Sequence, residues 1–371
     1  MPNLAKKIKL LWITNMPAPY RQTIWNCLEL EIKLKVVFNE SEKNHWHAGI
    51  EGEKSWEYRY LNKKIRYIGE YPLISNPFGT IRDIKQSDLI LVNGLENTVF
   101  IASLIYASLI GKKSIIFYDS HYGSHRFKGA FARKIRFLIL NLANFVVTAG
   151  PSSTKAVVTS GIKAHKVIEL FNTVDVLKFY ESTSDLRQED LSKHRYLYVG
   201  QFITRKNVLN LIIAFSKIKG PQDVLKIVGT GELKLQMEKL IEDLNLSNSV
   251  FILGYKSPEE VLKIYAESDT LVLPSTEEVW GLVANEALAS GLHLVISRQC
   301  GATETIENMK GVYVCETGAE SIAKNMKQSC LEFKGRINDP EIMQFTPEKF
   351  AKKLSELIFS MENRSSRDGL D

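Results

Sequence analysis

The chain has 371 residues, more than one hydrophobic core usually supports, so its length predicts two domains. Its 44% hydrophobic and 24% charged residues are typical of a globular protein and exclude a disordered or fibrous one. The net charge of +6 is uneven, because residues 1–175 carry 24 Lys and Arg against 14 Asp and Glu, whereas residues 176–371 carry 24 against 28. The basic half is expected to meet an anionic partner: nucleic acid, a membrane surface or a phosphorylated substrate. An ordinary solvated lysine-rich surface is the alternative.

Targeting signals and cysteine motifs are not evident in the sequence. The N-terminal MPNLAKKIKLLWI has only a short apolar run, so we expect no secretory signal and a cytoplasmic location. The longest apolar stretch, residues 99–110, is shorter than the roughly 20 residues that span a bilayer. The cysteines form no C-x-x-C pair, which argues against a disulfide framework or a cysteine-based zinc site: Cys27, Cys300, Cys315 and Cys330.

Short apolar runs alternate with longer helical patterns along the whole chain. In the first half these runs are Leu10–Ile13, Leu34–Phe38, Leu89–Val92, Ser114–Phe117 and Phe145–Thr148. In the second half they are Tyr196–Val199, Leu225–Val228, Val250–Leu253, Thr270–Leu273, His293–Ile296 and Val312–Val314. Because the runs lack polar alternation, they predict parallel strands buried on both faces in an α/β fold.

The composition suggests where one domain ends and the next begins. Residues 1–177 are expected to form one Rossmann-like domain, the polar segment 178–193 a linker, and residues 194–345 a second Rossmann-like domain. Residues 346–371 begin with Thr346 as a helix N-cap and Pro347 at the first helical position. Two doubly wound sheets would face each other across a cleft, with ligand sites at the carboxyl ends of the strands.

The clearest local motif is TLVLPSTEEVWGLVANEALASGLHLVIS, residues 270–297. A buried strand is followed by a loop with Glu278 and then by a helix with Glu286 in its first turn. The free N–H groups of Gly281 and Leu282 at the helix start favour an anion, typically a phosphate. Carboxylates beside them suit hydrogen bonds to sugar hydroxyls. On the pair alone, acidic residues that merely complement a helix N-terminus are the alternative.

Two further loops follow predicted strands. In YVGQFITRKNVLNLIIAF, residues 198–215, a strand ends at Gly200 and the next loop carries Arg205 and Lys206, which could neutralise a diphosphate. A solvated basic loop is the alternative. The segment IVGTGE, residues 227–232, contains Gly229 and Gly231, but a G-x-G turn alone is weak evidence.

Together these segments resemble the family 4 retaining glycosyltransferases of the two-Rossmann GT-B architecture. The resemblance covers most of residues 145–360 and is most specific at E-x7-E, with support from VLPST, ILGY and NTVD. It implies retaining transfer of a hexose from a nucleotide-diphosphate sugar to a glycan or lipid-linked saccharide. It further implies a C-terminal helix that returns to the first domain.

The resemblance also implies roles for individual residues. Arg205 and Lys206 would hold the diphosphate, Glu286 the ribose, and Glu278 the hydroxyls of the donor sugar. The backbone of Trp280, Gly281 and Leu282 would meet the phosphate and sugar, and Gly200, Gly229 and Gly231 would also contact the donor. His121, which follows a first-domain strand, would lie near the reacting centre and act with Glu278, Arg205 and Lys206 in catalysis; a structural histidine is the alternative, and Asp119 and His125 are competitors.

The sequence departs from the family pattern at two places. Gln201 stands where most members have an arginine, so Arg205 would have to assist Lys206. The loop ITNMPAPYR, residues 13–21, lacks the family's frequent Gly-Gly. This loop would line the acceptor side with Tyr20 and Arg21, together with Asp119, so the departure leaves the acceptor's identity open.

No D-x-D motif is present, so the carboxylate clamp that commonly holds Mg²⁺ or Mn²⁺ on a diphosphate is missing. We therefore expect metal-independent transfer without a cofactor, in which cations and helix N-termini stabilise the departing diphosphate.

Residues 126–144, RFKGAFARKIRFLILNLAN, read as a basic amphipathic helix. At helical spacing its apolar stripe comprises Phe127, Phe131, Ile135, Leu138 and Leu142. The opposite face carries Arg126, Arg133 and Arg136, with Lys134 on one flank. The simplest interpretation packs the stripe against the first sheet. Because Phe137 and Leu140 fall on the basic face, peripheral binding of that face to an anionic membrane is the second interpretation. Nucleic-acid binding is not expected.

Two other functions fit the same architecture. One is a nucleotide-sugar epimerase, which would need no acceptor; the E-x7-E context argues against it. The other is a non-catalytic nucleotide-sugar sensor or scaffold, and Gln201 is its only support in the sequence.

Overall fold

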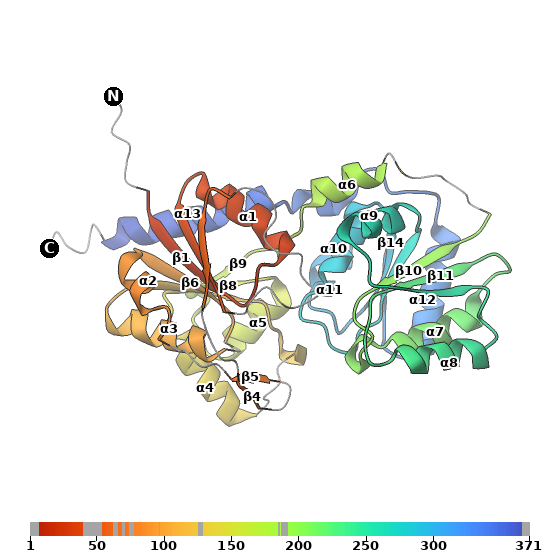
Figure 1. Cartoon of the computed structure of the whole chain (residues 1–371), viewed down its shortest axis with the longest axis horizontal. Helices are drawn as coiled ribbons and strands as arrows, with labels where there is room; N and C mark the ends of the chain where they lie inside the picture. The colour runs from red at the N-terminus through yellow and green to blue at the C-terminus, as the bar shows by residue number, and fades with distance from the viewer. Residues whose placement is uncertain are drawn as a thin grey trace. The chain divides into compact units, whose positions relative to one another are not determined.

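The computed structural model describes residues 7–39, 54–61, 66–68, 71–73, 78–95, 97–124, 129–184, 186 and 192–365. Contacts within the chain divide it into two compact units (Figure 1). Unit 1 comprises Met1–Ser120, His125–Asn172 and Pro347–Asp371, and unit 2 comprises His121–Ser124 and Thr173–Thr346.

Unit 1 is built on a seven-stranded parallel sheet in the order β3-β2-β1-β6-β7-β8-β9. The strands are β1 (Lys9–Thr14), β2 (Lys33–Phe38), β3 (Glu57–Tyr60), β6 (Leu89–Asn93), β7 (Lys113–Tyr118), β8 (Phe145–Thr148) and β9 (Val167–Glu169). A separate antiparallel pair joins β4 (Arg66–Ile68) to β5 (Tyr71–Leu73). The central strands are fully buried, which explains their unbroken apolar sequences.

Helices cover both faces of this sheet (Figure 1). They are α1 (Pro19–Glu29), α2 (Ile81–Gln86), α3 (Thr98–Leu109), α4 (Ala130–Leu140), α5 (Pro151–Thr159) and α13 (Pro347–Ser365). Although α13 comes last in the chain, it packs against α1 and belongs to unit 1, as predicted. Phe350 of α13 lies 5.9 Å from Phe117 of β7, ring centre to ring centre, and Lys113 Nζ donates a hydrogen bond to the Met361 carbonyl at 2.7 Å.

Unit 2 repeats the arrangement with a six-stranded parallel sheet in the order β12-β11-β10-β13-β14-β15. Its strands are β10 (Arg195–Val199), β11 (Val224–Val228), β12 (Val250–Gly254), β13 (Thr270–Leu273), β14 (His293–Ser297) and β15 (Val312–Cys315). Its helices are α6 (Val176–Ser184), α7 (Val208–Ile218), α8 (Lys234–Asp243), α9 (Pro258–Ala266), α10 (Leu282–Ala289), α11 (Thr303–Ile306) and α12 (Ala319–Glu332). In Figure 1, α7, α8 and α12 lie on one side of the sheet and α6, α9 and α10 on the other.

Every predicted strand is present, and the α/β fold is as expected. The edge strands β3 and β9 were not predicted, because edge strands are half-exposed and need no continuous apolar run. Part of the predicted linker, residues 178–184, is helical instead: it belongs to α6, which packs against α9 and α10.

The orientation of α4 differs from the prediction. Leu140 is fully buried and Phe137 packs against the core of unit 1, where its ring faces Gly161. Three residues of the stripe that was expected to pack inward point to solvent instead, with Phe131 79%, Ile135 42% and Leu138 55% exposed, whereas Leu142 packs against the core as predicted. Helical periodicity identified two faces, but it could not decide which one the sheet covers. Phe127 and Arg126 lie outside the described residues.

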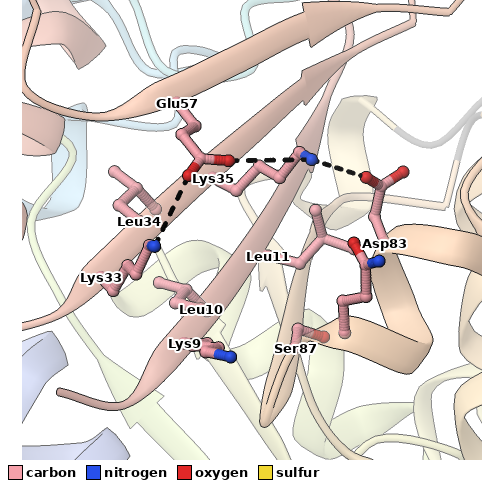
Figure 2. Close-up of a pocket in the computed structure, with 10 residues that line it drawn as sticks. Lys9, Leu10, Leu11, Lys33, Leu34, Lys35, Glu57, Asp83 and Ser87 are labelled. Carbon is pink, nitrogen blue, oxygen red and sulfur yellow. Dashed lines mark ion pairs between the residues drawn. The ribbon is translucent and has the colours of Figure 1, made fainter. Parts of the chain in front are cut away.

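A pocket of about 310 Å³ lies at the amino ends of β1 and β2, and ion pairs cross it (Figure 2). Lys35 Nζ lies 2.9 Å from a carboxylate oxygen of Asp83, which also pairs with Arg59. Glu57 lies 3.6 Å from Lys33 and 3.9 Å from Lys35. Burial favours the neutral form of Asp83, but the hydrogen bonds from Arg59 and Lys35 outweigh it and lower its pKa.

Asp83 should therefore stabilise unit 1 at neutral pH. Asp83→Asn should lower the free energy of unfolding by about 1–3 kcal/mol, because Arg59 and Lys35 lose the buried carboxylate that both contact. Since the folded pKa is below the ordinary 3.8, the difference from wild type should be full above pH 3.8 and shrink as the pH falls through the folded pKa. Urea unfolding across pH measures it. Glu57→Gln, at a side chain 58% exposed, is the control and should cost less than about 1 kcal/mol; equal losses would contradict the prediction.

Candidate functional site

Two loops of unit 2 meet because their strands, β10 and β13, are neighbours in the sheet. The loop after β10 carries a short 3₁₀ turn, Thr204–Lys206, and the loop after β13 runs from Pro274 to the start of α10. The Thr276 amide donates a hydrogen bond to the Arg205 carbonyl at 2.8 Å. Asn207, in the left-handed conformation with φ 61°, donates to the Pro274 carbonyl at 3.0 Å. The predicted cation loop and the predicted carboxylate loop are therefore fastened together.

The half-buried Lys206 and the buried Glu278 form an ion pair at this junction. The side chain of Lys206 is 14% exposed and that of Glu278 is 11% exposed. Ser275 Oγ lies 3.5 Å from the same carboxylate oxygen. Arg205 is exposed, and its Nη1 lies 3.4 Å from the Glu277 carbonyl. Lys206 is thus neutralised by a carboxylate, whereas Arg205 contacts the same loop through a backbone carbonyl. A ligand phosphate would have to compete with Glu278 for Lys206.

His121 lies against the carboxylate loop. Its Nε2 lies 2.9 Å from the Glu278 carbonyl oxygen, and its Nδ1 accepts a hydrogen bond from the Gly123 amide at 3.2 Å. Because Nδ1 accepts, the ring proton belongs on Nε2, which donates to Glu278. Both ring nitrogens are therefore engaged, and the histidine holds the backbone of Glu278 in place.

Glu286 lies in α10, where it meets a tyrosine that the sequence analysis did not single out. The Tyr265 hydroxyl donates a hydrogen bond to Glu286 Oε2 at 2.8 Å. Burial raises the pKa of Glu286 above its ordinary range, and the hydrogen bond from Tyr265 opposes this only in part. Tyr265 is itself fully buried and packs edge to face on Phe179 of α6 at 5.9 Å. The carboxylate is thus held in one orientation by a rigid neighbour.

The start of α10 depends on Gly281. Its φ of +92° lies in the left-handed region, and a Cβ there would lie 2.8 Å from the side chain of Leu273. Trp280 is buried and its Nε1 donates to Asn285 Oδ1 at 3.3 Å. Leu282 is the first helical residue. The amides at this end carry the positive end of the helix dipole.

The glycines of the other two loops have a packing role. A Cβ on Gly229 would lie 1.9 Å from the Gly200 carbonyl oxygen, and one on Gly231 would lie 2.5 Å from the Phe202 carbonyl oxygen. Hydrogen bonds join the same loops, from Gly200 N to Val228 O at 3.0 Å and from Phe202 N to Thr230 O at 2.8 Å. Glycine is needed here because two backbones touch.

The three predicted acceptor-side residues line one pocket in unit 1. This pocket has a volume of about 250 Å³ and lies where β1, β6 and β7 end. Tyr20 and Arg21 reach it from the start of α1, and Asp119 follows β7. His125, the other competitor, lies outside the described residues.

Sequence reasoning missed three residues of the unit 2 site: Tyr265, Cys300 and Gly301. The Gly301 amide donates to the Glu278 carbonyl at 3.0 Å, and a Cβ there would lie 3.2 Å from the His121 ring. Cys300 is buried beside Glu278, and burial holds its thiol pKa well above the usual range. A glycine directly after a buried strand and its turn was the available signal for Gly301. No sequence signal pointed to Tyr265, because nothing in the sequence of α9 indicated that this helix faces α10.

Two findings bear on metal and membrane binding. Within the described ranges, no group of three or more His, Cys, Asp or Glu is placed to hold a metal ion. No helix in the part of the chain that the structure describes is long and apolar enough to cross a membrane.

The two parallel, helix-covered sheets define an α/β fold of the GT-B type. A sucrose-phosphate synthase from Thermosynechococcus elongatus superposes with a TM-score of 0.75 at 18% identity, over 96% of this chain and 100% of that one. Anabaena Alr3699/HepE in complex with UDP and glucose superposes with a TM-score of 0.70 at 17% identity, over 95% of this chain and 100% of that one. At these identities the likeness is one of fold.

Part of the sequence of unit 2 matches a known family. Residues 183–332 match the model described as glycosyl transferases group 1. The uncharacterized glycosyltransferase MJ1607 of Methanocaldococcus jannaschii is 33% identical over 129 residues, which is 34% of this chain and 33% of that protein. The alignment therefore spans about a third of the relative's length.

Glu286 gives this site a testable pH dependence. Its folded pKa is raised above 4.5, so its ionised form destabilises the fold, and the free energy of unfolding should fall as the pH rises through the window above 4.5. Glu286→Gln removes that charge and should be more stable than wild type at neutral pH by roughly 0.5–2 kcal/mol. The difference should narrow toward acid pH. Thermal unfolding at several pH values measures this difference in stability. A Glu286→Gln variant that is less stable than wild type at neutral pH would contradict the prediction.

Proposed function

We propose that the protein is a retaining, metal-independent glycosyltransferase that moves a hexose from a nucleotide-diphosphate sugar to a glycan or lipid-linked saccharide. Synthesis of a cell-surface polysaccharide or glycolipid is the setting that suits such an acceptor. Unit 2 would bind the donor and unit 1 the acceptor.

The observation that carries the proposal is the junction of the two loops in unit 2. It gathers Arg205, Lys206 and Glu278 at the carboxyl ends of β10 and β13, inside the region that matches the group 1 glycosyl transferases. Cations at this edge of a parallel sheet, close to the start of α10, suit a diphosphate. The similar fold of Anabaena Alr3699/HepE, in complex with UDP and glucose, supports a nucleotide-sugar donor.

The residues divide the work between positioning and charge stabilisation. Arg205 would supply a planar fork for one phosphate, while Lys206 would shift from Glu278 to the departing diphosphate. Glu278, released from Lys206, would accept hydrogen bonds from hydroxyls of the donor sugar, and Glu286 would accept those of the ribose. His121 would act through the loop that it holds. The β-phosphate oxygen could take the acceptor's proton on the face where the new bond forms, which leads to retention.

Metal independence follows from the same cations. Lys206 and Arg205 would neutralise the leaving diphosphate in place of a divalent ion, and the sequence has no D-x-D to hold one. EDTA should therefore leave turnover unchanged.

Donor turnover tests the proposal. Across UDP-, GDP- and ADP-sugars, with and without EDTA, one nucleotide diphosphate should be released slowly. Lys206→Ala should lower its rate of release by about 10²–10³-fold, because it removes a cation aimed at developing charge. Lys217→Ala is the matched control, since Lys217 lies in α7 and pairs only at the surface with Glu320. Near-wild-type release by folded Lys206→Ala would refute this role.

We also propose that unit 1 docks on an anionic membrane through α4. The outward stripe of Phe131, Ile135 and Leu138 is flanked by exposed Arg133 and Lys134. Apolar side chains among cations suit the interface of an anionic leaflet, where each cation contributes about 1 kcal/mol. A lipid-linked acceptor would then be met at the surface.

Vesicle co-sedimentation measures this docking. The wild type should bind anionic vesicles in preference to neutral ones. Arg133→Gln with Lys134→Gln should weaken binding about tenfold or more, and Phe131→Ser with Leu138→Ser should weaken it without loss of stability. Leu235→Ser, at a leucine of α8 that is 76% exposed, is the control. Equal binding of the wild type to neutral and anionic vesicles would refute the electrostatic part.

A further inference from the structure

The pocket at the carboxyl ends of β1, β6 and β7 contains a buried cation with unused hydrogen-bonding capacity. Arg21 is 3% exposed and lines the pocket, and its buried Nη1 has no hydrogen-bond partner among the residues that the structure describes. A guanidinium is charged at every physiological pH. An unsatisfied polar atom in such a place costs stability, and a native fold normally pairs it.

Aromatic rings explain how the fold tolerates this charge. The Arg21 guanidinium carbon lies 4.7 Å from the ring centre of Phe117, 5.3 Å from Tyr20 and 5.7 Å from Trp12. These rings attract a cation but accept no strong hydrogen bond from its N–H groups. The surrounding rings restrict the movement of the guanidinium and leave its Nη1 donor available. This is the arrangement of a preorganised binding group.

The position of the pocket favours a ligand. In the sheet order β2-β1-β6, the chain turns from one side of β1 to the other, so the carboxyl ends of β1 and β6 form a topological switch point. Thr14 and Asn93 end these two strands and both line the pocket. The start of α1 adds the positive end of a helix dipole.

We infer that Arg21 binds a phosphate or carboxylate group of the acceptor substrate. The planar fork of an arginine matches either oxyanion, and a low-dielectric wall of aromatic rings strengthens the contact. The pocket of about 250 Å³ suits one anionic group with part of the molecule that bears it. The larger pocket of Figure 2 differs, because Lys33 and Lys35 there are already paired with carboxylates of the protein.

Asp119 restricts the ligand further. Its carboxylate lines the same pocket, together with the polar groups of Asn15 and Ser120. A bare anion would be repelled by Asp119, whereas a hydroxyl would donate a hydrogen bond to it. The best fit is a hydroxylated anion, such as a sugar phosphate or a hydroxy acid, with its oxyanion on Arg21 and a hydroxyl on Asp119.

This inference rests on the proposed function, because it names the class of acceptor for the same transferase. Donor turnover and anion binding can nevertheless be measured separately. Release of a nucleotide diphosphate without acceptor tests the transferase. Ligand-induced thermal stabilisation tests the anion site, and saturating UDP keeps the proposed donor site occupied during that measurement.

The experiment compares wild type with Arg21→Met, Arg21→Lys and the control Arg82→Gln, at an exposed arginine of α2 in the same unit. The probes are inorganic phosphate, glucose 6-phosphate and L-malate, with glucose and potassium chloride at matched ionic strength as controls. At least one anionic probe should stabilise wild type and Arg82→Gln alike. Arg21→Met should bind it about 10- to 100-fold more weakly, since charge-assisted hydrogen bonds are lost. Arg21→Lys should lie between, because it keeps the charge without the fork.

A ligand-binding role also predicts the stability of the empty protein. Arg21→Met should unfold at the same temperature as wild type or higher, because it removes a buried unpaired donor. If Arg21→Met fails to fold, the test relies on Arg21→Lys. Thermal stabilisation of Arg21→Lys by an anion to the same extent as wild type would overturn the inference. Failure of every anionic probe to stabilise wild type, while a nucleotide diphosphate is still released, would overturn it and leave the transferase intact.

Two measurements distinguish a water-soluble source of the anion from a lipid-linked one. Stabilisation by glucose 6-phosphate would assign a water-soluble acceptor. Arg21-dependent co-sedimentation with phosphatidylcholine vesicles that contain polyprenyl phosphate, but not with plain phosphatidylcholine vesicles, would assign a lipid-linked one. If glucose 6-phosphate, L-malate and inorganic phosphate all fail to stabilise the protein and the vesicles show no Arg21-dependent binding, an anion site at Arg21 is rejected.

Discussion

Both large sheets are parallel throughout, and this constraint determines where the chemistry can lie. Parallel strands send all their following loops to one edge, so residues far apart in the sequence meet there. In unit 2 the loops after β10 and β13 meet, and Lys206 pairs with Glu278 across 72 positions of sequence. In unit 1 the loops after β1, β6 and β7 enclose the pocket of Arg21. Each unit thus offers one polar edge.

The two edges differ in how they treat charge. In unit 2 the half-buried Lys206 is paired with Glu278. In unit 1 the buried Arg21 lies among aromatic rings, and within the described part of the chain its Nη1 has no hydrogen-bond partner. A ligand can bind a paired cation only by displacing the carboxylate that already contacts it. A cation without such a partner can bind a ligand directly. This contrast suits a diphosphate that forms and departs in one unit and a substrate that is recognised by a fixed group in the other.

Much of the fold was readable from the sequence, because strands buried on both faces have unbroken apolar runs. Edge strands such as β3 carry no such run and were missed. The orientation of α4 was predicted the wrong way round, since both of its faces carry apolar residues and only the packed structure shows that Leu140 lies inside. The E-x7-E spacing located Glu278 and Glu286, but neither partner was predictable. Pairing of Glu278 with Lys206, and of Glu286 with Tyr265, depends on tertiary packing alone.

The glycines at 229 and 231 have a consequence for attempts to change the specificity of the proposed donor site. The backbone of Gly200 and Phe202 fills the space where a side chain would start, so the requirement for glycine comes from the packing of the fold. Libraries aimed at new donor specificity should leave both positions fixed. Gln201 lies in the same loop, and its half-buried side chain is free of that restriction, which makes it the better place to introduce diversity.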